Sequence, residues 1–148
     1  MPALAQPDLT QYPPRSPRVP LGGYVHLPRV LDKARAFAAG KNGEYNYNCP
    51  RDRQFFDFTG VSDAAFLAEA KQGKSDSEML AWVQTQTKRT PVEIAGWSAW
   101  MTSDGPGGHY AHGRYRETIE KHAPERKDIH TFFDLLDLDD YVTFGGKA

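Results

Sequence analysis

Cysteine is almost absent from this sequence. A single residue, Cys49, occurs in 148, so no disulfide can form within the chain. Disulfides are typical of small secreted domains, and their absence fits a reducing compartment. The N-terminus also lacks the basic start and the apolar core of about 7–15 residues that mark a secretory signal. No apolar run approaches the ~20 residues of a membrane-spanning helix. We therefore expect a cytoplasmic protein without a membrane segment.

A large charge of either sign is missing as well. The 18 basic and 19 acidic residues give a net charge of -1. Residues 1–60 carry eight Lys or Arg against five Asp or Glu, whereas residues 61–148 carry ten against fourteen. Nucleic-acid-binding domains usually have a strongly basic patch, so we expect no nucleic-acid partner. The opposite signs predict that the two parts of the chain attract each other.

Helical patterns fill most of the chain, whose length is that of one domain with a core of its own. Capping residues, N-terminal prolines and terminating glycines delimit the helices. We predict a mainly α-helical, compact single domain over residues 21–148, with a small extended or two-stranded element near Tyr45. A glycine-rich loop is expected at residues 104–113. The predicted helices cover about residues 28–39, 51–58, 62–72, 75–86, 91–101, 115–122 and 129–142.

Residues 1–20 form a distinct segment that contains six of the eleven prolines. This composition disfavours both a helix and a central strand, so we predict an extended arm. Arg15 and Arg18 are three residues apart and project in similar directions from an extended chain. They belong either to a strap over the surface or to an anion-binding site.

The helix expected at residues 28–39 has one apolar face. Its members recur at the spacing of a buried helical stripe and are Val30, Leu31, Ala34, Phe37 and Ala38. The charged residues fall elsewhere on this helix, so we expect them in solvent, with Asp32 paired to Arg35. These charged residues are Arg29, Asp32, Lys33 and Arg35.

Cys49 is the first candidate for chemistry. It precedes Pro50, which is favoured as the first residue of a helix, so the thiol is expected at a helix cap. There it faces free backbone N–H groups and the positive end of the helix dipole, a position that favours the reactive thiolate. The alternative is a buried cysteine that packs as a small hydrophobic residue.

Polar aromatic residues accompany Cys49. Tyr45, Tyr47 and Cys49 alternate with other residues, which predicts a short strand with all three on one side, or else an irregular loop. Together with Tyr24 and His26 they can line a polar pocket, in which the histidine titrates near neutral pH. The alternative is that the tyrosines bury their rings and donate hydrogen bonds to the backbone.

A metal pattern is present but incomplete. His109 and His112 have HxxH spacing, and Asp104 is a candidate third ligand. Zinc motifs usually place two histidines at i and i+4 on a helix, with a glutamate between them. We therefore predict no metal and no cofactor.

The last predicted helix carries a run of acidic residues near its end: Asp134, Asp137, Asp139 and Asp140. Negative charge there opposes the helix dipole, so compensating cations are expected. Arg15, Arg18 or Arg29 would provide them and make this helix an internal clasp. The alternatives are a calcium-type site and a surface that docks a partner.

Several segments resemble one protein family. They are PPRSPR, LGGYVHLPRVLDKARA, GEYNYNCP, the pair Phe55 and Phe56, and the closing FDLLDLDD. Together they resemble the bacterial family called domain of unknown function 5069, over about residues 8–141. The resemblance implies that the polar stretch and the acidic tail belong to one architecture. It carries no known reaction and therefore no catalytic roles.

These residue types point first to a protein that binds a small polar or anionic molecule. The predicted site consists of Tyr24, His26, Arg29, Tyr45, Tyr47, Cys49 and Asp52. If the protein is an enzyme, Cys49 acts as nucleophile or His26 as the acid–base group. The alternative is an interaction module whose arm and acidic helix bind a partner protein or a second copy of the chain. A purely structural or stress-related role is the third hypothesis.

Overall fold

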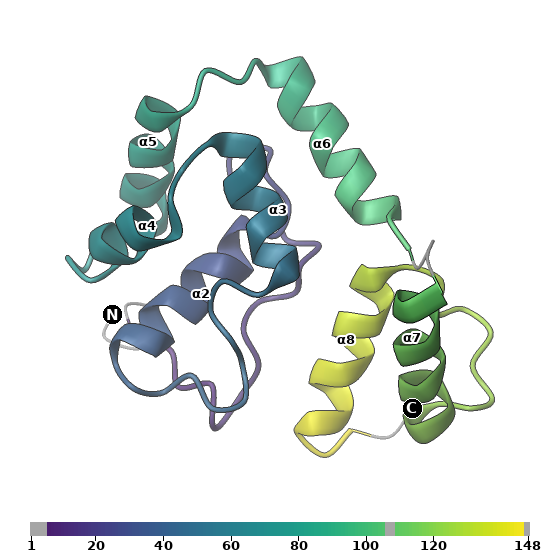
Figure 1. Ribbon diagram of the computed structural model, residues 1–148. Helices are drawn as coiled ribbons and strands as arrows, with labels where there is room; N and C mark the ends of the chain where they lie inside the picture. The colour runs from purple at the N-terminus through teal and green to yellow at the C-terminus, as the bar shows by residue number, and fades with distance from the viewer. Residues whose placement is uncertain (1–5, 106–108, 147–148) are drawn as a thin grey trace.

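The structure is a computed structural model that describes residues 6–105 and 109–146, with the backbone alone for residues 109–115. Its described residues form a compact, mainly α-helical fold, as the sequence predicts (Figure 1). The helices are α2 (Leu27–Ala38), α3 (Pro50–Thr59), α4 (Asp63–Ala70), α5 (Asp76–Gln86), α6 (Pro91–Ser103), α7 (His109–His122) and α8 (Phe132–Thr143). None of these described helices is long and apolar enough to cross a membrane. In Figure 1, α2 to α5 form one group, α7 and α8 form a second, and α6 connects them.

Local signals set the starts of several helices, and these starts agree with the prediction. The hydroxyls of Ser62 and Ser75 cap α4 and α5, each accepting a hydrogen bond from the backbone N–H three residues later. Thr90 and Glu93 form a reciprocal capping box at the start of α6, with Pro91 as the first helical residue. Such caps satisfy N–H groups that every helix start leaves without an internal partner.

The helix α7 begins earlier than predicted. The sequence favours a glycine-rich loop over residues 104–113, whereas α7 already starts at His109. Gly113 therefore lies within a helix, although glycine disfavours helix formation by about 1 kcal/mol relative to alanine. The side chains of His109 and His112 lie outside the described residues, so the HxxH pair stays a prediction.

The strand expected around Tyr45 does not form. Residues 41–49 run through successive turns, which is the irregular loop that the sequence also allowed. Among the described residues, strand-like pairing is limited to one bridge between Leu21 and Tyr24. Gly22 makes this turn possible, because its φ is 58° and an added Cβ would lie 2.5 Å from the Leu80 side chain.

The core is aromatic and lies around α2 and α3. Tyr24 and Phe55 are fully buried, and Phe56, Phe66 and Trp97 close around them. Neighbouring rings meet mainly edge to face, as Tyr24 and Phe55 do with centroids 5.6 Å apart and an interplanar angle of 83°. Each such pair contributes about 0.5–1.5 kcal/mol beyond the area that it buries. The aromatic residues of the chain thus form much of its core.

Helix α2 is buried almost all round, which corrects its predicted faces. Val30, Leu31 and Ala34 are buried as expected, but Phe37 is 49% exposed and Ala38 is exposed. The four charged residues expected in solvent are buried instead: Arg29, Asp32, Lys33 and Arg35. Each has a partner from another part of the chain, because a buried charge without one costs several kcal/mol.

The proline-rich arm supplies one of these partners. Arg15 Nη2 lies 2.9 Å from Asp32 Oδ1 of α2, and Arg15 Nη1 lies 2.7 Å from Asp76 Oδ2 of α5. Arg35 contacts the same Asp76 carboxylate at 2.9 Å, so the predicted pairing of Asp32 with Arg35 is wrong. Arg15 is therefore part of a strap that joins α2 to α5.

The acidic helix α8 binds the basic first part of the chain, as the opposite charges predict. Arg18 of the arm contacts Asp134 and Asp137. Arg29 of α2 forms a two-pronged pair with Asp140, at 2.6 and 3.0 Å. The side chains of this second pair are only 4% and 9% exposed. The internal clasp is thus confirmed.

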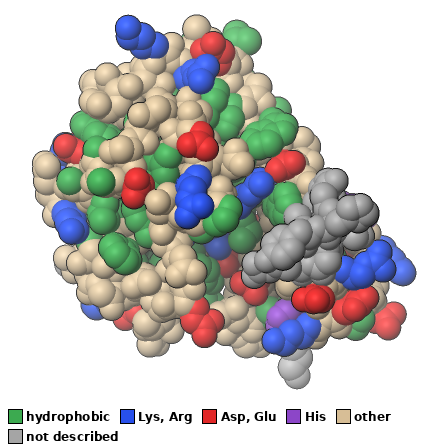
Figure 2. Space-filling model, viewed as in Figure 1, with side chains coloured by type: hydrophobic (Ala, Val, Ile, Leu, Met, Phe, Trp, Pro, Cys, Tyr) green, Lys and Arg blue, Asp and Glu red, His purple; other side chains and the backbone are tan. Residues whose placement is uncertain are grey.

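The outer surface carries both signs of charge. On the face shown in Figure 2, basic and acidic side chains are interspersed with apolar ones. They do not gather into one continuous basic area on that face. The four charged side chains of α2, by contrast, are buried.

We expect Arg29→Met to lower the free energy of unfolding by about 3–5 kcal/mol, because it leaves Asp140 buried without its ion-pair partner. Combining it with Asp140→Leu should recover much of this loss, since both charges are then removed. Urea unfolding of the single and double variants measures the difference. Asp128→Asn, which removes the exposed pair with Arg126, serves as a control with an unchanged midpoint. Equal losses in the single and double variants would contradict this account.

Candidate functional site

A buried carboxylate, Asp52, lies at the centre of the candidate site. Its Oδ1 is 2.8 Å from His26 Nε2, and its Oδ2 is 2.7 Å from Lys33 Nζ. Oδ2 also accepts hydrogen bonds from the backbone N–H groups of Asn48 at 3.0 Å and Cys49 at 3.3 Å. Asp52 is fully buried, so these donors replace water around its charge. We call Asp52, His26, Lys33 and Cys49 the Asp52 cluster.

Two unusual backbone positions and a helix start bring this cluster together. His26, the cap of α2, and Asn48 both have positive φ, at 69° and 64°, which is uncommon for residues other than glycine. Cys49 is the cap of α3, and Pro50 is the first residue of that helix, as predicted. Asp52 completes a capping box with Cys49. The box turns the carboxylate back toward the start of α3, where it meets α2.

Asp52 is held as an anion. Burial by itself would raise the pKa of Asp52, but the hydrogen bond from His26 and the charge of Lys33 outweigh burial and lower this pKa to about 2. A carboxylate that is ionised at neutral pH and occupied by four donors has little capacity to take a proton from a substrate. Its role is therefore to orient the two side chains that it binds.

His26 is a neutral, buried donor. Its ring stacks on Phe133 of α8, with centroids 5.9 Å apart and an interplanar angle of 16°. Burial lowers the pKa of His26, and the nearby Asp52 offsets only part of this effect. Because Nε2 donates to the carboxylate, Nδ1 carries the lone pair, and it has no hydrogen-bond partner among the described residues. The ring is fully buried, so it does not reach an external ligand in this conformation.

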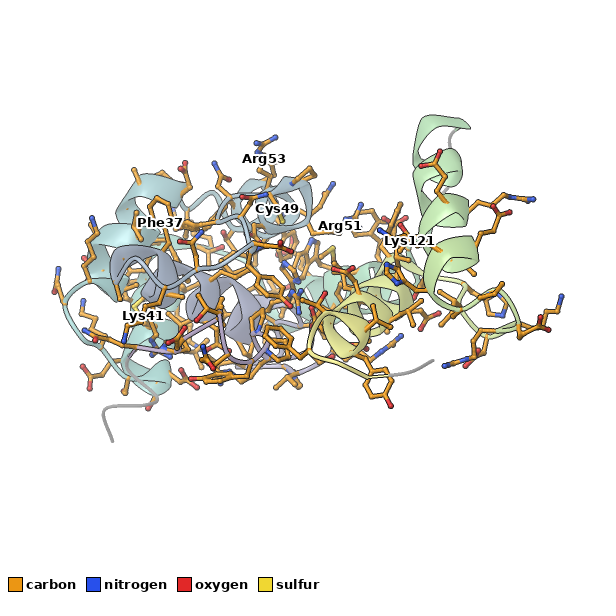
Figure 3. All side chains as sticks on the ribbon, turned by 90° about the horizontal axis from the view of Figure 1, so that it is seen from below. Phe37, Lys41, Cys49, Arg51, Arg53 and Lys121 are labelled. Atoms are coloured by element: carbon orange, nitrogen blue, oxygen red, sulfur yellow. The ribbon has the colours of Figure 1, made fainter. Side chains whose placement is uncertain are left out.

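Lys33 connects Asp52 to Cys49. Its Nζ lies 3.2 Å from Cys49 Sγ as well as 2.7 Å from the carboxylate, and its side chain is 5% exposed. Cys49 is a partly exposed residue, and its thiol has the charged Lys33 amine as a donor. In Figure 3, Cys49 lies on the same side of the molecule as Phe37 and Arg53. Arg53 follows Cys49 by one helical turn, is exposed, and has no ion-pair partner within the part of the chain described.

The three tyrosines and the arginine of the predicted site contact other parts of the molecule. Tyr24 belongs to the aromatic core. The Tyr47 hydroxyl donates to the backbone carbonyl of the first residue of α4 at 2.8 Å. The Tyr45 hydroxyl donates to Asp140 at 3.0 Å, the carboxylate that also binds Arg29. The structure therefore brings His26, Asp52 and Cys49 together. It places Tyr24 and Tyr47 in or against the aromatic core, and Arg29 and Tyr45 at Asp140 in the clasp.

Lys33 is the member of the site that sequence reasoning missed. Its position in the helical pattern places it off the apolar face, so it resembled an ordinary solvated lysine. Its partners, Cys49 and Asp52, follow it by 16 and 19 residues. The spacing of residues within a helix does not predict contacts between residues so far apart in the sequence.

Metal ligands are not gathered in the described part of the molecule. There, no group of three or more His, Cys, Asp or Glu side chains is arranged to hold a metal ion. Asp104, the predicted third partner of the HxxH pair, instead contacts Arg51 at 2.8 Å.

A match over most of the chain gives its family. The family described as domain of unknown function DUF5069 matches residues 11–142. The chain belongs to this family. No curated protein matches it. The DUF5069 region begins in the arm and ends in α8, so the Asp52 cluster and the clasp both lie inside it.

The burial of His26 predicts a pH dependence of stability for this DUF5069 protein. The native pKa of His26 lies below its unfolded value of about 6.5, so the unfolded chain binds a proton that the native protein does not. Stability is therefore complete above that pH and falls as the pH drops below it, by about 1 kcal/mol per pH unit. Urea unfolding between pH 7.5 and 5.5 measures this slope.

His26→Gln is the matched variant, because its amide can still donate to Asp52 but does not titrate. The remaining histidines are common to both proteins and cancel in the comparison. We expect a shallower decline in stability for the variant than for the wild-type protein. An identical decline in both would show that His26 does not control it.

Proposed function

We propose that this DUF5069 protein binds small anionic electrophiles and that Cys49 attacks them as a nucleophile. The observation that supports the proposal best is the 3.2 Å contact between the buried Lys33 ammonium group and the partly exposed Cys49 sulfur. A positive charge at this distance stabilises negative charge on the sulfur. A thiolate is the nucleophilic form of cysteine.

The surroundings of the thiol suggest how a ligand is held. Cys49 lies at the start of α3, where backbone N–H groups and the helix dipole favour an anion. The Arg53 guanidinium, one turn further along, is available to a carboxylate or phosphate group of the ligand. A ligand with an electrophilic atom near its acidic group would contact both side chains.

In this proposal His26 and Asp52 position other groups rather than touch the ligand. Asp52 fixes Lys33 beside the sulfur, and His26 supplies one of the hydrogen bonds that keep Asp52 ionised. Both residues are fully buried, so the acid–base role suggested for His26 by residue type gives way to a positioning role. Whether the captured molecule is then released, as an enzyme requires, is decided by turnover measurements.

The alternative of an interaction module has less support. It relies on the arm and on α8 as surfaces for a partner, but Arg18 of the arm already binds Asp134 and Asp137 of α8 within the same chain. A second copy could exchange arms with the first only by breaking these contacts. A change in the number of subunits, measured from the mass in solution with and without residues 1–20, would support this alternative.

Alkylation of Cys49 tests the proposed function. Cys49 is the one thiol in the chain, so the rate of modification reports on it alone. We expect Lys33→Met to slow the reaction with iodoacetamide about tenfold, because it removes a charge-assisted hydrogen bond of about 1.5 kcal/mol or more. Arg53→Gln should slow the anionic reagent iodoacetate more than the neutral iodoacetamide.

Lys41→Met is the control, since Lys41 is an exposed lysine outside the Asp52 cluster. Its alkylation rates should match those of the wild-type protein. Thermal unfolding of each variant establishes that it is folded. If Lys33→Met does not fold, Lys33→Arg is the second variant, because it keeps the positive charge. A Lys33→Met protein that folds and reacts at the wild-type rate would overturn the proposal.

A further inference from the structure

We infer that oxidation joins Cys49 and Lys33 by a covalent bond and thereby closes the site. This inference rests on the proposed function only in that both concern the same thiol, and it names a regulation of that site. The bond would form between Cys49 Sγ and Lys33 Nζ, which are 3.2 Å apart in the reduced protein. It makes the pair a modification site that responds to peroxide.

The first support is the absence of any competing thiol. Oxidised cysteines usually condense with a second cysteine to give a disulfide. Cys49 is the one cysteine in the chain, so a sulfenic acid formed there has no thiol partner within the molecule. A nucleophile that can replace the thiol lies against the sulfur, the amine of Lys33 at 3.2 Å.

The second support is the way the two side chains are held. The Lys33 side chain is 5% exposed and its amine is fixed by Asp52 at 2.7 Å, so it cannot swing into solvent without breaking that pair. Cys49 is partly exposed and can be reached by a molecule as small as hydrogen peroxide. The oxidant therefore arrives at the sulfur, while the amine already lies against it.

The chemistry balances with one equivalent of peroxide. The thiolate attacks one oxygen, the O–O bond breaks, and an S–O bond forms, giving the sulfenic acid and, after protonation, water. Sulfur is oxidised by two electrons and the peroxide is reduced by two. Lys33 then releases a proton to solvent, its nitrogen attacks the sulfur, and the hydroxyl group leaves as a second water. The product is a sulfenamide, and a thiol reductant returns the thiol and the amine.

The cross-link would alter the Asp52 cluster in a defined way. Lys33 loses its positive charge when its nitrogen bonds to sulfur, so Asp52 keeps its donors from His26 and the two backbone N–H groups but no longer has a cationic partner. Cys49 is no longer a thiolate, because its sulfur has been oxidised by two electrons and is bonded to nitrogen. One reversible step thus removes both the nucleophile and the charge that supports it.

Mass spectrometry of the full chain after hydrogen peroxide treatment tests the inference. We expect a mass about 2 Da below that of the reduced protein, from the loss of two hydrogens, and a linked peptide that contains Lys33 and Cys49. Dithiothreitol should restore the original mass. Lys41→Gln should behave like the wild-type protein, whereas Lys33→Gln should gain about 16 Da per added oxygen, because its amide does not attack the sulfur.

A wild-type protein that gains oxygen without a linked peptide, or that forms a disulfide-bonded dimer of doubled mass, would overturn the inference. The wild-type result decides the question even if Lys33→Gln does not fold. Alkylation of the reduced protein is a separate measurement. A Lys33-dependent alkylation rate without a cross-link refutes the inference alone, whereas a cross-link without such a rate dependence refutes the proposed function alone.

Discussion

The structure depends on the burial of charged side chains along one helix, α2. Arg29, Asp32, Lys33 and Arg35 are all buried there, and each would destabilise the fold by several kcal/mol if it had no partner. Their partners come from the arm, α3, α5 and α8. Because each pair forms only in one arrangement of these elements, the charges specify where the segments pack as well as how tightly. Two of the four partners, Asp76 and Asp140, belong to the acidic second part of the chain.

Features that depend on near neighbours could be predicted from the sequence. The caps at Ser62, Ser75 and Thr90 and the position of Cys49 before Pro50 rest on interactions within three or four residues, and the structure confirms them. The attraction between the basic and acidic parts was also predictable, because it needs only the sign of each charge. The choice of Asp140 for Arg29, 111 residues away, was not.

The errors share one physical cause. Apolar spacing placed Phe37 inside and Lys33 outside. The structure reverses the two, because Lys33 has a buried ion-pair partner in Asp52, whereas Phe37 lies at the exposed end of α2. Likewise Tyr45 and Tyr47 looked like one side of a strand, yet each hydroxyl binds a different distant acceptor. Periodicity describes which residues share a face, and it does not say what that face will meet.

Asp52 joins the stability of the fold to the chemistry of its candidate site. Its carboxylate accepts from His26, Lys33 and two backbone groups, so it is too fully occupied to act on a ligand itself. What it does instead is hold one lysine against one thiol. The same contact that would make Cys49 reactive toward an outside molecule also makes Lys33 its nearest partner after oxidation. Reactivity and its reversible loss would then follow from a single distance, set by a buried anion.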